Sequence, residues 1–346
     1  MKRPTISDIA RLAGVTKAAV SFALNGQPGV SAATRERILA IAAEIGFEPN
    51  SAARALSDGR AGAYGLVIDR PARLLGMEPF FMQLISGIQA ELSGTGAALL
   101  FGTAGDQAAE IATYRSWWAQ RRVDGVFVID LQIGDRRVPV LEELRMTAVV
   151  IGTPEGAGTL PAVWQDEAAA TRAAVEYLTG LGHTQLARVT GIPRFWHTKI
   201  RTDAFLAAAE SAGADAVCVE ADYTGERGAA ATRQLLAASQ PPTAIVYDND
   251  IMALAGLSAA QRLGVDVPAE LSIVAWDDSP LCEFVHPPLT ALTRDIVAYG
   301  AHAARVLVQV ADGAATGHLK EPLAMLTPRG STGRAPQARP RPAAFP

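Results

Sequence analysis

Two series of short apolar runs alternate with helical stretches through most of the chain, and this alternation limits the possible folds more than any other feature. The runs that resemble buried strands are residues 63–69, 98–102, 125–130 and 148–152 in the first series, and 186–191, 216–220, 244–248 and 271–277 in the second. Stretches with helical spacing lie between them, such as 80–96, 168–182 and 250–264. Strands that alternate with helices form parallel sheets covered on both faces. The sequence therefore predicts an α/β body of two doubly wound parallel-sheet lobes, with a ligand cleft between them at the carboxyl ends of the strands.

The first 47 residues follow a different pattern, that of three short helices. Ile6, Ile9, Ala10 and Ala13 share one face of the first helix, and Gly14 ends it. Candidate N-caps open the second and third helices at Thr16 and Ser31. Two short helices joined by a tight glycine turn are typical of a helix-turn-helix, so we expect an all-α helix-turn-helix head.

The second helix of the head divides into an inner and an outer face. Val20, Ala23 and Leu24 continue the apolar stripe, whereas Lys17, Ala18, Ser21 and Phe22 fall on the other side. An exposed Phe22 in a DNA major groove would meet thymine methyl groups, and Lys17 would reach guanine or phosphate. The alternative is a purely structural three-helix bundle in which Phe22 packs against a neighbour.

Charge is distributed unevenly between the head and the rest of the chain. The whole sequence has a formal net charge of −4, but residues 1–60 hold eight Lys and Arg against five Asp and Glu, a net charge of +3. The remainder therefore carries −7. A basic head on an acidic body indicates that the head alone has a nucleic-acid partner.

Residues 48–60 suggest a hinge helix and linker. Asn50 is a candidate cap after Pro49, and 51–56 would make a helix too short to be stable unless it is docked. Arg54 and Leu56 would project from it. An ordinary linker with a solvated Arg54 is the alternative.

Other features of the chain argue against an enzyme, a metal site and a membrane protein. The cysteines, Cys218 and Cys282, stand far apart without metal-ligand spacing, and the five histidines are scattered. The sequence lacks the GxSxG, HExxH and P-loop motifs, so we expect neither catalysis nor a cofactor. No apolar run reaches the roughly 18 residues of a membrane helix, and the start has no secretory signal, which favours a cytoplasmic protein. Residues 334–346 are rich in Arg and Pro and lack heptad leucines, so we expect a disordered tail and a dimer.

Polar and aromatic residues at the predicted strand ends are the candidates for ligand contacts. They are Asp69, 248–250 and 276–278, together with Trp164, 195–197, Arg201 and 222–223 between elements. Each could instead be a helix cap or a core residue. Aromatic rings beside Asp, Asn and Arg suit a sugar, because the rings stack on its apolar faces and the polar groups bind its hydroxyls in pairs.

The head resembles the DNA-binding domain of the lactose/galactose repressor (LacI/GalR) family of bacterial transcription regulators. The segments that carry the resemblance are "TISDIARLAGVTKAAVSFALNG" (5–26) and "PNSAARAL" (49–56). The resemblance implies that the second helix reads the major groove of an operator, that Leu56 wedges into the minor groove, and that Ala53 lets two hinge helices touch. The DNA contacts it implies are Ser7, Thr16, Lys17, Ala18, Ser21, Phe22, Asn25, Ser31, Thr34, Asn50, Ala53, Arg54 and Leu56. The chain departs from the family pattern at Phe22, where Arg is usual, and at Ala19, where Thr is common.

The body resembles the effector-binding domain of the same family, which is similar to periplasmic sugar-binding proteins. Matching segments include "EPFF" (78–81), "YDNDIMALAGLSAA" (247–260) and "GVDVPAELSIVAWDD" (264–278). The effector contacts that this implies are Phe80, Trp164, Trp196, His197, Arg201, Tyr223, Asn249, Trp276, Asp277 and Arg294. Arg201 and Asp277 lie in well-matched segments. Arg294 stands where the family commonly has Gln, and Ala204 where it has Gly.

The sequence thus predicts a ligand-responsive DNA-binding regulator, most simply a homodimeric repressor of carbohydrate-utilisation genes that a sugar releases from a pseudo-palindromic operator. Residues 61–333 would bind effector and dimerise, with lobes at 61–161 plus 292–333 and at 162–291. A nucleoside or nucleobase effector, corepression, and a sugar-binding transport module are the alternatives.

Overall fold

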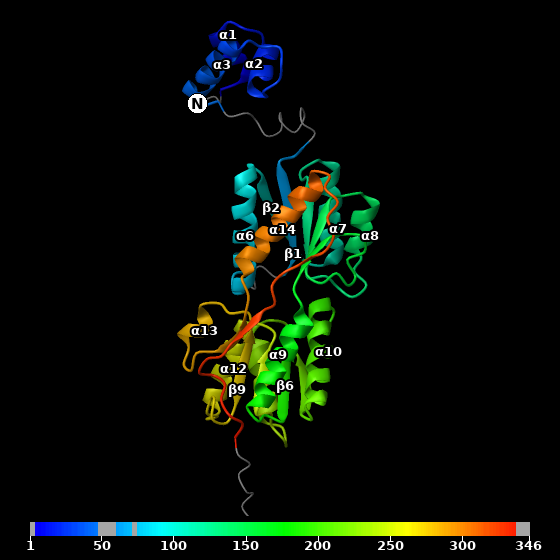
Figure 1. Ribbon diagram of the computed structural model, residues 1–346, viewed down its shortest axis with the longest axis vertical. Helices are drawn as coiled ribbons and strands as arrows, with labels where there is room; N and C mark the ends of the chain where they lie inside the picture. The colour runs from blue at the N-terminus through cyan, green and yellow to red at the C-terminus, as the bar shows by residue number, and fades with distance from the viewer. Residues whose placement is uncertain (1–3, 48–59, 71–74, 337–346) are drawn as a thin grey trace, which may run out of the picture. The chain divides into compact units, whose positions relative to one another are not determined.

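The computed structural model describes residues 4–47, 60–70 and 75–336, and the chain divides into two compact units, Met1–Gly62 and Ala63–Pro346 (Figure 1). The predicted hinge contacts Asn50, Ala53, Arg54 and Leu56 lie outside the described residues, as do residues 337–346 of the predicted tail. Within the described parts, no helix is long and apolar enough to cross a membrane.

The head consists of three helices, α1 (Ile6–Ala13), α2 (Lys17–Leu24) and α3 (Ala32–Glu44). Ile9, Val20 and Ile38, one from each helix, are fully buried at its centre. The turn between α1 and α2 is left-handed at Gly14 (φ +64°), and the Thr16 hydroxyl then accepts a hydrogen bond from the Ala19 amide at 3.2 Å. The helix-turn-helix predicted from the apolar spacing is therefore confirmed.

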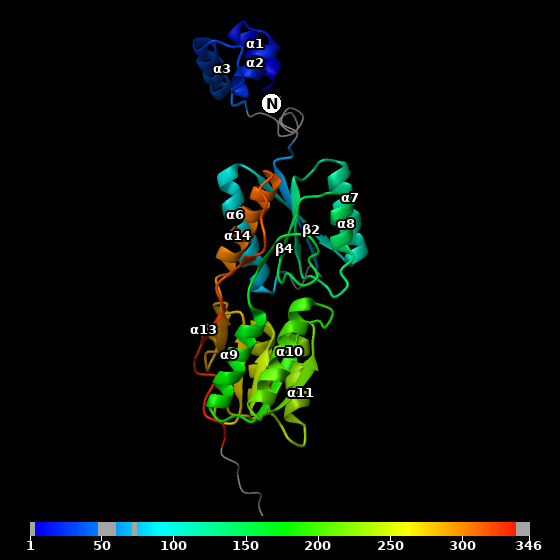
Figure 2. The same cartoon turned by 45° about the vertical axis from the view of Figure 1, so that its right-hand side comes forward.

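The first lobe of the body is a six-stranded parallel sheet in the order β11-β5-β4-β3-β1-β2. Its strands are β1 (Ala63–Asp69), β2 (Ala98–Ala104), β3 (Gly125–Ile129), β4 (Ala148–Ile151), β5 (Ala162–Trp164) and β11 (Leu319–Lys320). Helices α6 (Pro79–Thr95) and α14 (Ile296–Ala311) cover one face, and α7 (Gln107–Ala119) and α8 (Arg137–Glu143) cover the other (Figure 2).

The second lobe repeats this architecture with strand order β12-β10-β9-β8-β6-β7. Its strands are β6 (Gln185–Thr190), β7 (Asp215–Glu220), β8 (Ala244–Tyr247), β9 (Ser272–Trp276), β10 (Thr290–Thr293) and β12 (Met325–Thr327), the last antiparallel to its neighbour. Helices α9 (Glu167–Gly180) and α10 (Trp196–Ser211) pack on one face, and α11 (Gly225–Leu236) and α12 (Asp250–Arg262) on the other, while α13 (Leu281–Phe284) follows β9. The predicted pair of parallel-sheet lobes is confirmed.

The predicted boundaries between the lobes differ from the observed ones. Strand β5, expected in the second lobe, pairs with β4 in the first sheet, and β10 and β12, expected at least in part in the first lobe, join the second sheet. The described chain therefore passes between the lobes three times, after β5, after β10 and after β11. Strands of two to four residues carry too little apolar pattern to reveal which sheet they join.

Helices α6 and α14 approach so closely that each needs a glycine. A Cβ at Gly300 would lie 2.3 Å from the Leu84 carbonyl oxygen, and one at Gly87 would lie 1.9 Å from the Val297 carbonyl oxygen. Backbone atoms of a packed helix cannot move aside as a flexible side chain can.

We expect Gly300→Ala to destabilise the body by roughly 1–3 kcal/mol, because the added methyl forces the two helices apart. Gly94→Ala in α6 is the matched control, since a Cβ there meets nothing within 4 Å. That control should stabilise slightly through helix propensity. Thermal unfolding measures both, and equal melting temperatures for the two variants would contradict the close-packing argument.

Candidate functional site

The predicted DNA-contacting residues of the described head lie mainly on one exposed surface around α2. Lys17, Ala18 and Asn25 are exposed, and Ser21 is half-buried. Phe22 is 40% exposed, and its ring also lies against the turn at Gly29, where a Cβ would come within 3.3 Å of it. Phe22 therefore packs partly against a neighbour and leaves the rest of its ring exposed to a partner, so the two alternatives considered for it, packing and DNA contact, are compatible.

The remaining predicted head contacts surround this helix. Ser7, Thr16 and Ser31 are exposed, and Thr34 is half-buried. The Ser31 hydroxyl accepts a hydrogen bond from the Thr34 amide at 3.3 Å, so it caps α3 as predicted.

A cleft between the two lobes of the body has an empty volume of about 780 Å³, open solvent included. Seven of the ten predicted effector contacts line it: Phe80, Trp196, His197, Arg201, Tyr223, Asn249 and Arg294. Most of these follow the carboxyl ends of strands or begin the helices after them, which is where a doubly wound fold places its ligands.

The other three predicted contacts do not line the cleft. Trp276 is buried beneath Arg201, whose guanidinium carbon lies 3.6 Å from the centre of its ring. Asp277 accepts a hydrogen bond from Arg294 Nε at 2.6 Å and so holds a residue that does line it. Trp164 lies in the short strand β5, where Lys320 Nζ is 4.9 Å from its ring, and it takes no part in the lining.

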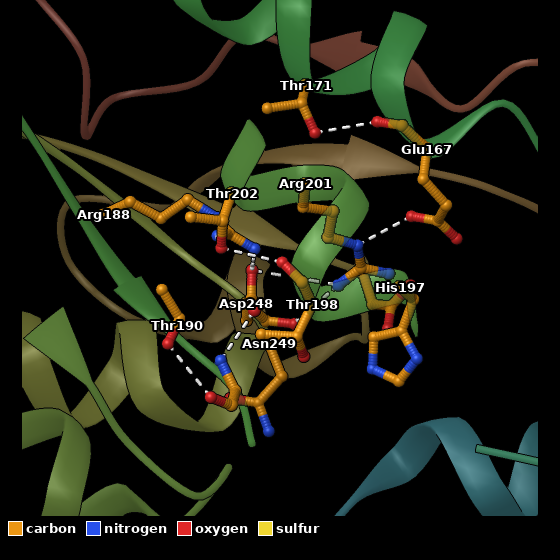
Figure 3. Close-up of polar contacts among 12 residues, drawn as sticks. Glu167, Thr171, Arg188, Thr190, His197, Thr198, Arg201, Thr202, Asp248 and Asn249 are labelled. Carbon is orange, nitrogen blue, oxygen red and sulfur yellow. Dashed lines mark hydrogen bonds and ion pairs between the residues drawn. The ribbon is translucent and has the colours of Figure 1, made fainter. Parts of the chain in front are cut away.

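Arg201 is the centre of a buried polar network in the second lobe (Figure 3). Its Nε donates a hydrogen bond to Glu167 Oε2 at 2.7 Å, and its Nη1 donates to the Asp248 carbonyl oxygen at 3.3 Å. Asp248 also accepts from Arg188 Nη2 at 2.5 Å and from the Gly191 amide at 2.6 Å. Burial opposes the charge on Arg201, but Glu167 and Asp248 outweigh it and raise the pKa of this guanidinium.

Arg294 lies beside this network and shares Glu167 with it. Besides Asp277, Arg294 binds the Gln165 side-chain oxygen at 3.0 Å and lies 3.5 Å from Glu167. Its guanidinium carbon is 5.1 Å from the centre of the Phe80 ring. The common Gln of the family is thus replaced by a cation that two carboxylates neutralise.

A second polar group gathers at Arg70 and Glu78, which come from the first lobe. Arg70 Nη2 lies 3.0 Å from Asp130 Oδ2, and its guanidinium carbon is 4.7 Å from the Phe195 ring centre. Glu78 Oε1 accepts a hydrogen bond from Asn249 Nδ2 across the cleft at 3.2 Å. Burial raises the pKa of Glu78 to about 8, although the nearby Arg70 charge acts in the opposite direction.

Asn249 has a structural task as well as a place in the lining. Its Oδ1 accepts a hydrogen bond from the Met252 amide at 2.8 Å, so it caps α12, as the alternative for this residue proposed. Its Nδ2 donates one hydrogen bond to Glu78 Oε1 and the other to the Tyr223 carbonyl oxygen.

Three residues at strand ends around the cleft have left-handed backbone conformations that non-glycine residues rarely adopt. They are Asp130 (φ +54°), Tyr223 (φ +70°) and Asp277 (φ +65°). Such conformations cost free energy and gather at functional sites. Tyr223, one of the three, also makes a buried side-chain contact, in which its hydroxyl and His197 Nε2 are 2.6 Å apart. Burial and the surrounding arginines lower the pKa of His197, so its ring is neutral at pH 7.

Sequence reasoning missed several residues of the lining, namely Arg70, Glu78, Asp130, Glu167 and Tyr299. Arg70 and Asp130 directly follow β1 and β3, and the strand-end rule that selected Asp69 could have found them. Glu78 lies in the "EPFF" segment, which was noted for its resemblance only. Glu167 and Tyr299 begin or lie within helices that follow the connections between lobes, where no local pattern identifies a cleft.

The lobes also contact each other through the backbone, away from the connecting segments. The Ile133 amide donates a hydrogen bond to the Arg194 carbonyl oxygen at 2.9 Å, and the Trp196 amide donates to the Leu131 carbonyl oxygen at 2.9 Å. We call residues 131–133 and 194–196 the backbone clasp.

Comparison with known proteins gives the same two-part organisation. Residues 5–50 match the family described as bacterial regulatory proteins, lacI family, and residues 175–332 match the periplasmic binding protein-like domain. The chain is 33% identical over 350 residues to the HTH-type transcriptional regulator MalR of Streptomyces coelicolor, covering 97% of this chain and 99% of that protein.

Solved structures agree along nearly the whole chain. The lac repressor dimer bound to operator and the anti-inducer ONPF has a TM-score of 0.84 and 26% identity, covering 96% of this chain and 100% of that one. The CelR–cellobiose complex has a TM-score of 0.73 and 29% identity, covering 95% and 100%. With its helix-turn-helix head and its two-lobed cleft, the chain belongs to the lacI family of bacterial regulatory proteins and is a ligand-responsive DNA-binding transcriptional regulator, not an enzyme.

Proposed function

We propose that this regulator is a repressor of carbohydrate-utilisation genes and that a mono- or disaccharide in the interlobe cleft releases it from its operator. The observation that carries the proposal is the combination of aromatic rings and paired polar groups in one cleft. Phe80 and Tyr223 offer ring faces, and Arg201 and Arg294 offer donors suited to hydroxyl oxygens. Similarity to MalR and to the cellobiose-bound CelR supports a sugar.

The buried polar network around Arg201 and Arg294 offers a route by which effector binding can affect DNA binding. Glu167 directly follows the first connection between the lobes, and Arg294 lies in the second. Gln165 joins these to the third connection, since its Nε2 donates a hydrogen bond to the Pro322 carbonyl oxygen at 3.1 Å. An effector that binds Arg201 and Arg294 therefore acts on all three connections and shifts the balance between lobe arrangements. A coupling of about 1–3 kcal/mol between the two sites would suffice for regulation.

On the DNA side, we infer that two heads of a homodimer place α2 in successive major grooves of a pseudo-palindromic operator. The lac repressor dimer supports this arrangement. Exposed apolar side chains on α13, with Phe284 78% and Leu281 40% exposed, are consistent with a surface for a second copy. Binding to operator DNA would place the protein on the nucleoid in the cytoplasm. Sedimentation as a monomer at operator-binding concentrations would contradict the dimer.

We expect Phe22→Ala to weaken binding to the operator more than binding to random duplex, because the exposed part of the ring contacts bases whereas Lys17 contributes mainly charge. The specific affinity should fall by about 1–3 kcal/mol. Fluorescence anisotropy with both duplexes measures the difference. An equal loss on the two would show that Phe22 supports the fold of the head at Gly29 and does not read bases.

A thermal-shift screen of sugars, sugar phosphates and nucleosides, followed by operator release measured with each stabilising compound, tests the effector proposal. Saccharides that raise the melting temperature and release operator support it. Stabilisation by nucleosides and by no sugar would overturn the assignment, and tighter operator binding with a sugar would indicate corepression.

A further inference from the structure

Among the described residues that line the cleft, five have a buried polar side-chain atom without a hydrogen-bond partner, namely Arg70 Nε, Glu78 Oε2, Asp130 Oδ2, Trp196 Nε1 and Asp250 Oδ2. Arg70 and Glu78 are only 5% and 7% exposed. Both residues line the cleft. Because a buried polar group without a partner costs free energy, this end of the cleft is suited to a polar group of a ligand.

The charges of the cleft limit what that group can be. Each of the three arginines in the lining already has a carboxylate partner: Arg70 has Asp130 at 3.0 Å, Arg201 has Glu167 at 2.7 Å, and Arg294 has Asp277 at 2.6 Å. Each guanidinium also lies over an aromatic ring. The lining arginines are thus already neutralised, and a ligand phosphate or carboxylate would enter a cleft whose described lining holds acidic side chains with no free cation to match it.

Beside Arg70, a ligand cation fits no better. Arg70 Nε is always a donor, so a ligand ammonium, which also only donates, would have to lie beside a like charge. A hydroxyl group can accept from Arg70 Nε and bind Glu78 with its remaining hydrogen or lone pair. Neutral saccharides carry such hydroxyl groups on adjacent carbon atoms.

Building on the proposed sugar-responsive function, we propose that Glu78 binds an effector hydroxyl as an uncharged carboxylic acid and that the cleft therefore selects neutral saccharides over phosphorylated, acidic and amino sugars. Asn249 holds Glu78 Oε1 from the opposite lobe, which leaves Oε2 to meet the ligand. Glu78 is then a specificity-determining residue that also links the two lobes.

The environment of Glu78 is consistent with the uncharged form. Burial raises its pKa to about 8, Arg70 opposes the shift, and the carboxylates of Asp130 and Asp250 add to it. In the unfolded chain the Glu78 carboxyl has a pKa of about 4.3. The folded protein therefore holds a proton that the unfolded chain releases, and the stability this residue contributes is lost as the pH rises from the unfolded pKa through the folded one.

The first experiment needs no ligand. The melting temperatures of the full-length protein and of Glu78→Gln are compared between pH 5 and pH 9, since glutamine keeps the shape and cannot ionise. We expect the melting temperature of the variant to rise by several degrees relative to that of the wild type as the pH increases, because only the wild type must retain a buried proton. Glu143→Gln, at an exposed carboxylate, is the control and should show no such trend. A difference between Glu78→Gln and wild type that does not change with pH would overturn the proposal.

The second experiment measures binding of cellobiose, maltose, glucose 6-phosphate, glucuronate, glucosamine and adenosine at pH 7 and pH 9. We expect a neutral saccharide to bind at least about tenfold tighter than any charged sugar, and its affinity for wild type to fall by up to about tenfold at pH 9. With Glu78→Gln that affinity should stay constant. Tighter binding of a charged sugar, or wild-type affinity that rises with pH, would overturn the proposal. Binding of adenosine and of no saccharide would remove the sugar function itself, whereas the first experiment tests Glu78 alone.

Discussion

Arg201→Ala is expected to remove the response at effector concentrations that release the wild-type protein, while the effector-free protein still binds its operator. The substitution removes the donors that Arg201 offers in the cleft, and hydrogen bonds from a charged group contribute about 1.5–3 kcal/mol each, so effector affinity should fall by roughly tenfold to a hundredfold. The fold should survive because both partners keep another cation. Glu167 remains 3.5 Å from Arg294, and Asp248 remains paired with Arg188.

Operator release as a function of effector concentration, together with operator affinity without effector, measures this outcome. Lys199→Ala is the matched control, since Lys199 lies on the same helix α10 but is exposed, and its ion pair among the described residues is with Asp203. Release by effector at wild-type concentrations in Arg201→Ala would remove Arg201 from the binding site. Loss of operator binding without effector would instead show that Arg201 maintains the lobe arrangement.

Asp248→Asn is expected to produce a large loss of stability. The carboxylate neutralises Arg188, whose side chain is fully buried, and it accepts a hydrogen bond from the Gly191 amide. Asparagine keeps the size but removes the charge, and it leaves a cation in the interior without its counter-charge. Breaking a buried pair in this way costs about 3–5 kcal/mol, which corresponds to a fall in melting temperature of roughly 6–20 °C.

Calorimetry of the effector-free protein gives this value directly. Asp203→Asn is the control, because its pair with Lys199 is solvent-exposed and worth at most about 1 kcal/mol. If both variants melted within a degree or two of wild type, the Arg188–Asp248 pair would have no stabilising role.

The helices of the head and the two-lobe architecture of the body could be predicted because their signals are local. Spacing of three and four residues places Ile9 and Val20 in the core of the head, and Gly14 marks the turn between two helices. In the body, β1 and β9 are apolar apart from one terminal residue each, Asp69 and Ser272, as expected for strands buried on both faces. The two short strands β5 and β12 were assigned to the wrong lobes because pairing partners, and not side-chain pattern, determine their sheet.

The cleft was predictable only in part, for a related reason. Tyr223 and Asn249 follow strands, so the rule for parallel sheets places them at the carboxyl edge. Trp164 also ends a strand, yet β5 lies next to the edge of its sheet and its tryptophan meets Lys320 and not the cleft. Tyr299 reaches the lining because α14 packs on the first lobe after the chain has crossed from the second. No sequence pattern encodes that crossing.

The backbone clasp joins the two lobes without using side chains that would select a ligand. Its hydrogen bonds join main-chain atoms of 131–133 to main-chain atoms of 194–196, so they persist whatever side chains stand at those positions. Leu131 and Trp196 of the clasp also line the cleft, but Glu78 and Arg294, which would distinguish one effector from another, lie outside the clasp. Substitutions at such positions can therefore change the compound to which a regulator of this design responds, while the backbone contacts between its lobes stay the same.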